Sequence, residues 1–382
     1  CLQLQRTIPV YFGQGEKPDQ VLFTLHNEGN HSVESPEVLL LDHQLRPIKT
    51  LAKQGQFSVA PKSTIKEKLD IQLSHYGHYS IVTQIGDHQA HAKLAWIADT
   101  AKPDRESEFG VQTHFSHGPW GRTQYFGGAE GVLKMAANLG AGWVRDDAHA
   151  RFRGETMIEP EKNLWSFTDN AVKFGLSPMI SHFDFLDDGK APDDDASRQR
   201  FANRAVQVLD HYGKDVKVYE VWNEPTIQPG WKRTPDAVEY TKLLKTVYST
   251  IKKHHPETTV LGICSAGTDF GFIETVLKNG GGKFMDGISV HPYHGVAPEL
   301  AANRHEPAPT WMGSGDTITF AKRIEAIKVL LDKYGVGDLP IWGTEMGYNN
   351  KDSREDWQQT QWLIRQYLIG MSIPYLARQF NY

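Results

Sequence analysis

The 382-residue sequence lacks several features that mark specialised protein classes. It contains two cysteines, Cys1 and Cys264, which excludes a framework of disulfides. Its net charge of −5 leaves no basic surplus for binding nucleic acid or an anionic membrane surface. No apolar run reaches the roughly 18 residues that a membrane-spanning helix requires. With 39% hydrophobic and 23% charged residues, the chain has the composition of an ordinary globular protein.

Motifs of several enzyme classes are also missing. The sequence has no G-x-S-x-G nucleophile elbow, no H-E-x-x-H zinc motif and no phosphate-binding P-loop. Four histidines in the β-rich N-terminal region form two pairs spaced by three residues, and on a strand the members of such a pair point to opposite faces. No cysteine or group of carboxylates accompanies them, so we expect no metal site there. These histidines are His75, His78, His88 and His91.

Residues 1–104 contain short β-rich runs and no amphipathic helix. Turn signals such as Gly29-Asn30 and Gly86-Asp87 separate these runs. This pattern predicts a small immunoglobulin-like β-sandwich, an accessory domain that either binds carbohydrate or serves as a spacer. The expected strands cover residues 7–12, 21–26, 37–41, 65–73, 79–85 and 91–98.

After a charged linker at 101–108, strands alternate with helices. The clearest helices are expected at 235–254, with Thr234 as N-cap, and at 317–334, with Asp316 as N-cap. Eight strands alternating with seven helices predict a (β/α)₈ barrel over 105–382 that lacks its last helix. Either the chain is shortened there, or another segment such as the N-terminal domain covers the eighth strand. The expected strands are 110–115, 142–146, 178–183, 216–223, 260–264, 287–291, 339–345 and 373–380.

Two of these strands end in a glutamate. One is the β-branched and aromatic run that leads into Trp222-Asn223-Glu224-Pro225, where the proline stops the strand. The other is the apolar run that ends at Glu345. Active sites of (β/α)₈ barrels lie at the carboxyl ends of the strands, so both carboxyl groups are expected to face one cavity. Paired carboxyls of this kind are the catalytic groups of glycoside hydrolysis, which needs no cofactor.

Three of these strand ends resemble one known family. The stretch 219–225, the tripeptide at 291–293 and Thr344-Glu345 are similar, in the same order, to the clan of TIM-barrel retaining glycoside hydrolases, and within it to family 39. That family includes β-xylosidases, α-L-iduronidases and bacterial exopolysaccharide endoglycosidases. The resemblance covers residues 108–382. It implies that Glu224 is the general acid/base, that Glu345 is the nucleophile and that Asn223 binds the sugar 2-hydroxyl.

Further polar and aromatic side chains are predicted near these carboxyls. Arg145 and Tyr293 are expected to donate hydrogen bonds to Glu345, although Arg145 has the alternative of neutralising Glu220. Three histidines stand at strand ends, either as substrate contacts or as buried core groups: His114, His182 and His291. Three tryptophans in expected loops offer flat surfaces for sugar rings, or else pack the loops: Trp231, Trp311 and Trp342.

The sequence therefore predicts a retaining glycoside hydrolase that acts on a polysaccharide or oligosaccharide, with endo-action favoured. An exo-glycosidase, a transglycosylase and a non-catalytic carbohydrate-binding protein are the alternatives. No nucleic-acid partner is expected, and the oligomeric state is left open. A first residue of cysteine is typical of lipid-anchored bacterial proteins after signal cleavage, so we expect an extracytoplasmic location: periplasmic, secreted or anchored through Cys1.

Overall fold

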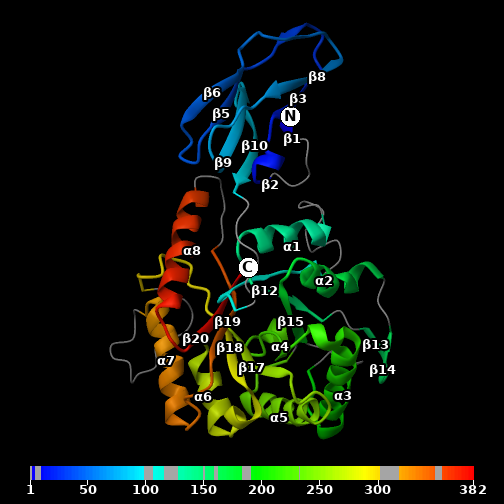
Figure 1. The fold of residues 1–382 in the computed structure, drawn as a ribbon, viewed down its shortest axis with the longest axis vertical. Coiled ribbons are helices and arrows are strands. Elements are labelled where there is room, and N and C mark those ends of the chain that lie inside the picture. Colours follow the sequence, from blue (N-terminus) through cyan, green and yellow to red (C-terminus); the bar gives the residue numbers. More distant parts are fainter. Residues whose placement is uncertain are drawn as a thin grey trace. The chain divides into compact units, whose positions relative to one another are not determined.

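The computed structural model describes residues 2–4, 10–98, 106–115, 128–148, 151–158, 162–182, 191–231, 233–301, 318–348 and 355–382. Contacts divide the chain into two compact units. The first consists of Cys1–Ala101 with Thr123–Leu139, and the second of Lys102–Arg122 with Gly140–Tyr382. The first unit carries β-sheets and the second a closed barrel (Figure 1).

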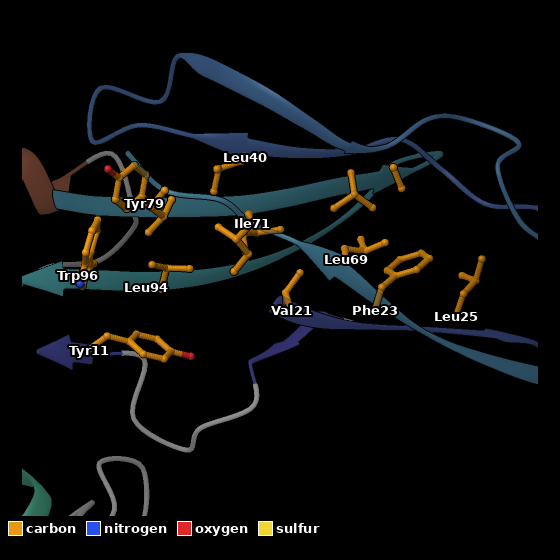
Figure 2. Packing of buried hydrophobic residues seen from close by; sticks show 14 of the residues in the cluster. Tyr11, Val21, Phe23, Leu25, Leu40, Leu69, Ile71, Tyr79, Leu94 and Trp96 are labelled. Carbon is orange, nitrogen blue, oxygen red and sulfur yellow. The ribbon is translucent and has the colours of Figure 1, made fainter. Parts of the chain in front are cut away.

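The first unit contains two sheets that share one apolar core. Alternate side chains along β3 and β8 point inward, as a sheet with one buried face requires. Phe23 of β3 belongs to one buried cluster with side chains of the other sheet, such as Leu40 and Trp96 (Figure 2). One sheet has the order β1-β3-β8 and the other β2-β10-β9-β5-β6. This arrangement is the predicted β-sandwich.

The elements of the first unit are short. Its main strands are β1 (Leu2–Leu4), β2 (Val10–Phe12), β3 (Gln20–Asn27), β5 (Val38–Leu41), β6 (Pro47–Ala52), β8 (Ser63–Asp70), β9 (Gly77–Ile85) and β10 (His88–Ile97). A minor ribbon pairs β4 (Val33–Glu34) with β7 (Ser58–Val59), and η1 (Gln14–Glu16) is a short 3-10 turn. Helix α1 (Gly128–Asn138) groups with this unit, where Lys134 forms an ion pair of 3.0 Å with Glu16.

The second unit is a closed barrel of eight parallel strands, each paired with the next and the last with the first. All eight predicted strands are present, with ends that differ by a few residues. They are β11 (Phe109–Gln112), β12 (Trp143–Asp147), β15 (Ser177–His182), β16 (Val218–Val221), β17 (Thr259–Ala266), β18 (Gly287–His291), β19 (Ile341–Met346) and β20 (Leu376–Asn381).

Helices follow the strands around the barrel. They are α2 (Lys162–Lys173), α3 (Asp195–Tyr212), the short α4 (Gln228–Trp231), α5 (Ala237–His254), α6 (Phe270–Lys278), α7 (Phe320–Lys333) and α8 (Glu355–Met371). The smaller elements are η4 (Gly213–Asp215), η5 (Gly281–Phe284) and the hairpin of β13 (Arg151–Arg153) with β14 (Thr156–Ile158). Within the described part of the chain, none of the helices is long and apolar enough to cross a membrane.

Two predicted helix starts are wrong. Helix α5 is capped by Asp236, whose carboxylate accepts the N–H groups of Val238 and Glu239, and not by Thr234. Helix α7 begins after Thr319, whose hydroxyl accepts from Lys322 N–H, whereas the predicted cap Asp316 lies outside the described residues. In both cases a second good capping residue lies two or three positions further along, and sequence alone does not choose between them.

One layer of side chains across the barrel interior is apolar. Five buried side chains from five strands pack together there: Met179, Val218, Leu261, Trp342 and Phe380. The rings of Trp342 and Phe380 stack at 6.3 Å between centroids, and Trp143 meets Trp342 edge-on at 5.6 Å. This apolar layer closes the barrel below the site described next.

Candidate active site

Polar side chains replace the apolar layer one inward-facing position further along the strands. Trp143 and Arg145 are two residues apart on β12, and Val218 and Glu220 are two residues apart on β16, so each pair shares a face. Arg145 and Glu220 are fully buried and meet as an ion pair, with 2.8 Å between Arg145 Nε and Glu220 Oε2. The carboxyl ends of the strands therefore enclose a charged layer.

Arg145 is the centre of this charged layer. Its Nη1 donates to Gln112 Oε1 at 2.7 Å and to Glu345 Oε2 at 3.3 Å, and its Nη2 donates to Asn223 Oδ1 at 2.8 Å. One guanidinium thus contacts both Glu220 and Glu345, so the two roles predicted for it as alternatives occur together.

The backbone around Glu224 is held in an unusual conformation. Trp222 and Glu224 both have positive φ, at 78° and 51°, a region that residues other than glycine rarely occupy. Trp222 donates its indole N–H to Gly230 O at 2.9 Å, and Glu224 donates its backbone N–H to Cys264 O at 3.0 Å. A Cβ at Gly230 would lie 2.1 Å from Glu224 O, so the chain passes Glu224 where only glycine fits.

The neighbouring strand β17 contributes a bulge. Its register with β18 shifts between Ile263 and Ser265. At this shift, Ile263 and Cys264 have φ of 80° and 45°. The hydroxyl of Tyr240 accepts Ile263 N–H at 2.7 Å and donates to Val221 O at 2.9 Å, which ties helix α5 to both strands. The bulge turns the thiol of Cys264 and its carbonyl toward the charged layer, so the strain lies at the site.

The two predicted catalytic glutamates lie together. Oxygens of Glu224 and Glu345 and a nitrogen of His291 lie within 4.8 Å of one another. His291 Nδ1 is 2.9 Å from Glu224 Oε1 and 3.8 Å from Glu345 Oε2. Tyr293 donates its hydroxyl to Glu345 Oε1 at 2.6 Å. Each carboxylate therefore has its own hydrogen-bond donors and both face the same space.

The electrostatics of the site follow from burial and charge. Burial is the largest single influence on the pKa of Glu220 and would raise it, but the charges of Arg145 and His291, together with hydrogen bonds from Thr344 and Ser289, hold that pKa below its ordinary value. Burial is also the largest single influence at Glu224 and would raise its pKa, but the hydrogen bond and charge of His291, together with the charge of Arg145, lower it. The Glu224 carboxyl is therefore stabilised in its ionised form by His291 and Arg145.

The pKa values of His291 and Cys264 are raised, whereas those of Glu220 and Glu224 are lowered. Burial is the largest single influence on the pKa of His291 and would lower it, but the charge of Glu345 and the hydrogen bonds with Cys264 and Glu224 raise it above its ordinary value. Burial, together with the charge of Glu220, raises the pKa of Cys264, which is therefore a neutral thiol.

Among the residues that the structure describes, two groups of side chains have the spacing of metal ligands. Glu224, His291 and Glu345 form one, and Glu220, Cys264 and His291 form the other. The Arg145 guanidinium touches members of both groups, with Nη2 3.6 Å from Cys264 Sγ. A fixed positive charge at this place disfavours a divalent cation, and the arrangement is that of an acid–base site.

The structure brings some of the predicted substrate-binding residues to the carboxylates. Asn223, Arg145, His291 and Tyr293 contact them or one another, as described above. His114 follows β11, remains partly exposed, and its Nδ1 lies 3.7 Å from Asp147 Oδ2. Trp311 lies outside the described residues.

Three other predicted substrate contacts lie elsewhere. His182 is buried and stacks on Phe201 of helix α3, because its position on β15 is out of phase with the inward-facing Ser181 and Met179. Trp342 belongs to the apolar layer. Trp231 is fully buried, with its ring 4.9 Å from that of Trp222. None of the three presents a ring to the charged layer.

Sequence reasoning gave little weight to other residues of the charged layer. Glu220 entered only as a partner for Arg145, although its phase on the strand points it inward. Gln112 and Asp147 are also inward-facing and buried, and no motif marks them. Cys264 reads as an apolar strand residue, and only the bulge brings its sulfur inward.

The fold is similar to that of solved glycoside hydrolase structures. A family 39 glycoside hydrolase from the gut symbiont Bacteroides cellulosilyticus WH2 matches with a TM-score of 0.68 and 22% identity, over 100% of this chain and 75% of its own. The GH39 enzyme from Xanthomonas axonopodis pv. citri matches with a TM-score of 0.53 and 16% identity, over 74% of this chain and 60% of its own.

A monomeric β-xylosidase from Caulobacter crescentus CB15 gives similar values: a TM-score of 0.52 and 17% identity, over 74% of this chain and 61% of its own. No protein-family model matches the sequence, and no curated protein matches it. The likeness therefore establishes the fold, a TIM barrel with a preceding β-sandwich as in family 39 glycoside hydrolases.

Proposed function

We propose that this protein is a retaining glycoside hydrolase. The observation that carries the proposal is the proximity of the two carboxylates, whose oxygens lie within 4.8 Å of each other at the carboxyl ends of β16 and β19. Retaining glycosidases separate their carboxyl groups by about 5–5.5 Å, whereas inverting enzymes keep about 6.5–9.5 Å to admit a water molecule. The fold, shared with family 39 structures, supports the same reading.

In this mechanism Glu345 attacks the anomeric carbon while Glu224 protonates the departing glycosidic oxygen. The glycosyl–enzyme ester on Glu345 is then hydrolysed by a water molecule whose proton returns to Glu224. Tyr293 and Arg145 donate hydrogen bonds to the Glu345 carboxylate and favour its ionised, nucleophilic form. Asn223 accepts from Arg145 through Oδ1, which leaves its amide NH₂ to donate to a sugar hydroxyl.

We further propose an endo-acting enzyme that works on a polysaccharide outside the cytoplasm. His114, with its partly exposed ring beside Asp147, offers a polar contact at the rim of the site. The β-sandwich is then an accessory domain that spaces the barrel or binds glycan. An exo-glycosidase of the β-xylosidase kind, or a transglycosylase, uses the same two carboxyls and differs in the products it forms.

The first experiment is product analysis on a panel of plant, algal and bacterial polysaccharides and aryl glycosides. Wild type is compared with Glu224→Gln and Glu345→Gln, and with Glu325→Gln, an exposed glutamate paired with Lys322, as a matched control. We expect both site variants to lose on the order of 10³-fold or more in rate and the control to keep full activity. The size of the products separates endo- from exo-action.

The stereochemistry and the nucleophile are tested separately. Proton NMR of the first product formed should show the substrate's anomeric configuration, and a 2-fluoro-glycoside should label Glu345, as detected by peptide mass spectrometry. Initial inversion of configuration, or full activity in Glu345→Gln, would overturn the proposal. Tight binding to one glycan without any cleavage would instead identify a carbohydrate-binding protein.

A further inference from the structure

The charged layer holds more carboxylates than positive charges. Three glutamates face it, Glu220, Glu224 and Glu345, and among the described residues Arg145 is the one arginine or lysine that forms an ion pair with them. Arg145 is already paired with Glu220 at 2.8 Å. Buried unbalanced charges are costly, so the layer favours at least one added proton.

His291 has the position to carry that proton. Its ring is fully buried, and each of its nitrogens meets a polar atom: Nδ1 lies 2.9 Å from Glu224 Oε1, and Nε2 lies 3.3 Å from Cys264 Sγ. Both carboxylates of the site therefore lie within 4 Å of one nitrogen, because Glu345 Oε2 is 3.8 Å from Nδ1. A proton on Nδ1 is shared most closely with Glu224.

The hydrogen bond with the Cys264 thiol determines which ring nitrogen of His291 gains and loses a proton. As a neutral thiol it directs its S–H toward Asn223 Oδ1, 3.8 Å away, and its sulfur accepts from Arg145 Nη2 at 3.6 Å. The sulfur is thus an acceptor for Nε2–H of His291, which holds one proton on Nε2 in both charge states of the ring. Nδ1 remains the nitrogen that gains and loses a proton.

We propose that Glu224 and His291 share a single exchangeable proton, with His291 Nδ1 as its resting place and Cys264 as the group that fixes Nε2–H. This inference rests on the proposed function of Glu224 as general acid/base. Before reaction the pair is a carboxylate and an imidazolium. Transfer of the proton from Nδ1 to Glu224 gives a neutral imidazole and a carboxylic acid, and the acid form then protonates the leaving oxygen.

The reaction itself drives this transfer. When Glu345 forms its ester with the sugar, its negative charge 3.8 Å from Nδ1 disappears, and with it one of the charges that keep the proton on His291. After the first step both Glu224 and His291 have lost the shared proton. The attacking water then delivers a proton to Glu224, and the proton returns to Nδ1 as the Glu345 carboxylate is regenerated, so no net proton is gained or lost.

The shared proton belongs to the pair and not to either residue. The alkaline limb of the kcat/KM profile therefore reports the pair, and lies well above the ordinary glutamate pKa of about 4.3. The groups that face His291 and set this limb come from β12, β16, β17, β19 and the segment after β18: Arg145, Asp147, Glu220, Asn223, Glu224, Cys264, Tyr293 and Glu345.

The test is the pH dependence of kcat/KM in three variants. His291→Asn places an amide N–H near the position of Nδ1 but cannot hold an exchangeable proton, so we expect its alkaline limb to move down by more than one pH unit. Cys264→Ala removes one hydrogen bond to the imidazolium and is expected to lower the limb by about half a unit to one unit. Cys264→Ser keeps an acceptor and should restore most of that shift.

A second readout does not depend on turnover. In protein labelled with ¹⁵N-histidine, both ring nitrogens of wild-type His291 should carry protons at pH 7, and Glu224→Gln should lower the pH at which the ring loses Nδ1–H. A neutral His291 ring at pH 7, or an unchanged alkaline limb in folded His291→Asn, would overturn the inference. If no glycoside is cleaved, the proposed function fails while the NMR titration still decides whether the proton is shared.

Discussion

The two halves of the barrel interior use the same strands for opposite purposes. In one layer across the barrel, Trp342, Phe380 and their neighbours are apolar, and one inward position further along β12 and β16, Arg145 and Glu220 are buried as charges. The apolar layer contributes stability by removing hydrocarbon from water. The charged layer gives little net stability, because each ion loses its hydration, and what it supplies is fixed geometry around the carboxylates. The barrel thus separates stability and chemistry along its axis.

The largest effect is expected when one charge is removed from the charged layer. Arg145→Met leaves Glu220 buried without its partner and should lower the free energy of unfolding by about 3–5 kcal/mol. It also removes a donor from Glu345, so activity should fall by about 10²-fold or more. Urea unfolding and steady-state kinetics measure the two effects.

A matched control for this change is Arg46→Met in the first unit. Arg46 pairs with Asp42 at 2.7 Å, but two thirds of its side chain is exposed, so the expected cost is at most about 1 kcal/mol. Equal losses in the two variants would contradict the assignment of Arg145 and Glu220 as a buried ion pair whose disruption leaves an uncompensated charge.

The apolar layer should respond in stability alone. Trp342→Ala removes a buried ring that packs on Phe380 and Trp143, and should cost about 3–5 kcal/mol in unfolding free energy. Because this ring does not reach the charged layer, kcat/KM per folded molecule should stay within about threefold. Trp357→Ala on α8, where nearly half of the residue is exposed, is the control, with an expected cost below about 1 kcal/mol. A large rise in KM in a stable Trp342→Ala variant would instead support the prediction that Trp342 offers a flat surface to a sugar ring.

A smaller effect is expected at Gly230, which packs against the backbone carbonyl of Glu224. In Gly230→Ala the new Cβ would meet Glu224 O, so the segment must shift, at a cost of about 1–3 kcal/mol in stability. A displacement of Glu224 by about 1 Å should reduce kcat by about 10²-fold. Gly271→Ala in α6 is the control, because its Cβ would meet nothing closer than 3.6 Å. Normal kcat in Gly230→Ala would show that Glu224 tolerates the shift.

The smallest effect is a slope in the pH dependence of stability. The pKa of Glu220 is lower in the folded protein than in the unfolded chain, so its contribution is fully present above the unfolded value of about 4.3 and is lost as the pH falls through the folded value. One such group contributes a slope of up to about 1.4 kcal/mol per pH unit. Urea unfolding of Glu220→Gln at several pH values below 5 should show a flatter dependence than wild type.

The fold could be predicted from the sequence because it depends on the periodicity of apolar residues and on the order of strands and helices along the chain. Eight apolar runs separated by helical segments give a barrel whatever the details of each strand end. The two carboxylates were also readable, because each closes a strand. His182 and Trp342 were assigned by their place near a strand end alone, although strand phase turns His182 outward and places Trp342 with the apolar layer.

Other features of the site depend on interactions that no single segment encodes. Cys264 reaches the charged layer only because a bulge, held by Tyr240 from helix α5, shifts the phase of β17. The lowered pKa of Glu224 depends on His291, which lies 67 residues away in the chain. Such long-range contacts are fixed by packing and not by local pattern.

The bulge of β17 has a consequence for protein engineering. A designer who transferred the site's side chains to an idealised barrel with regular strands would lose the Cys264 carbonyl that accepts Glu224 N–H, because this carbonyl turns inward only where Ile263 and Cys264 adopt positive φ. The transplanted glutamate would still be a carboxylic acid, but its side chain would no longer be held in the same orientation. For this protein the unit that can be transferred is the irregular pair of strands β16 and β17 with the helix that ties them together, and not a set of residues.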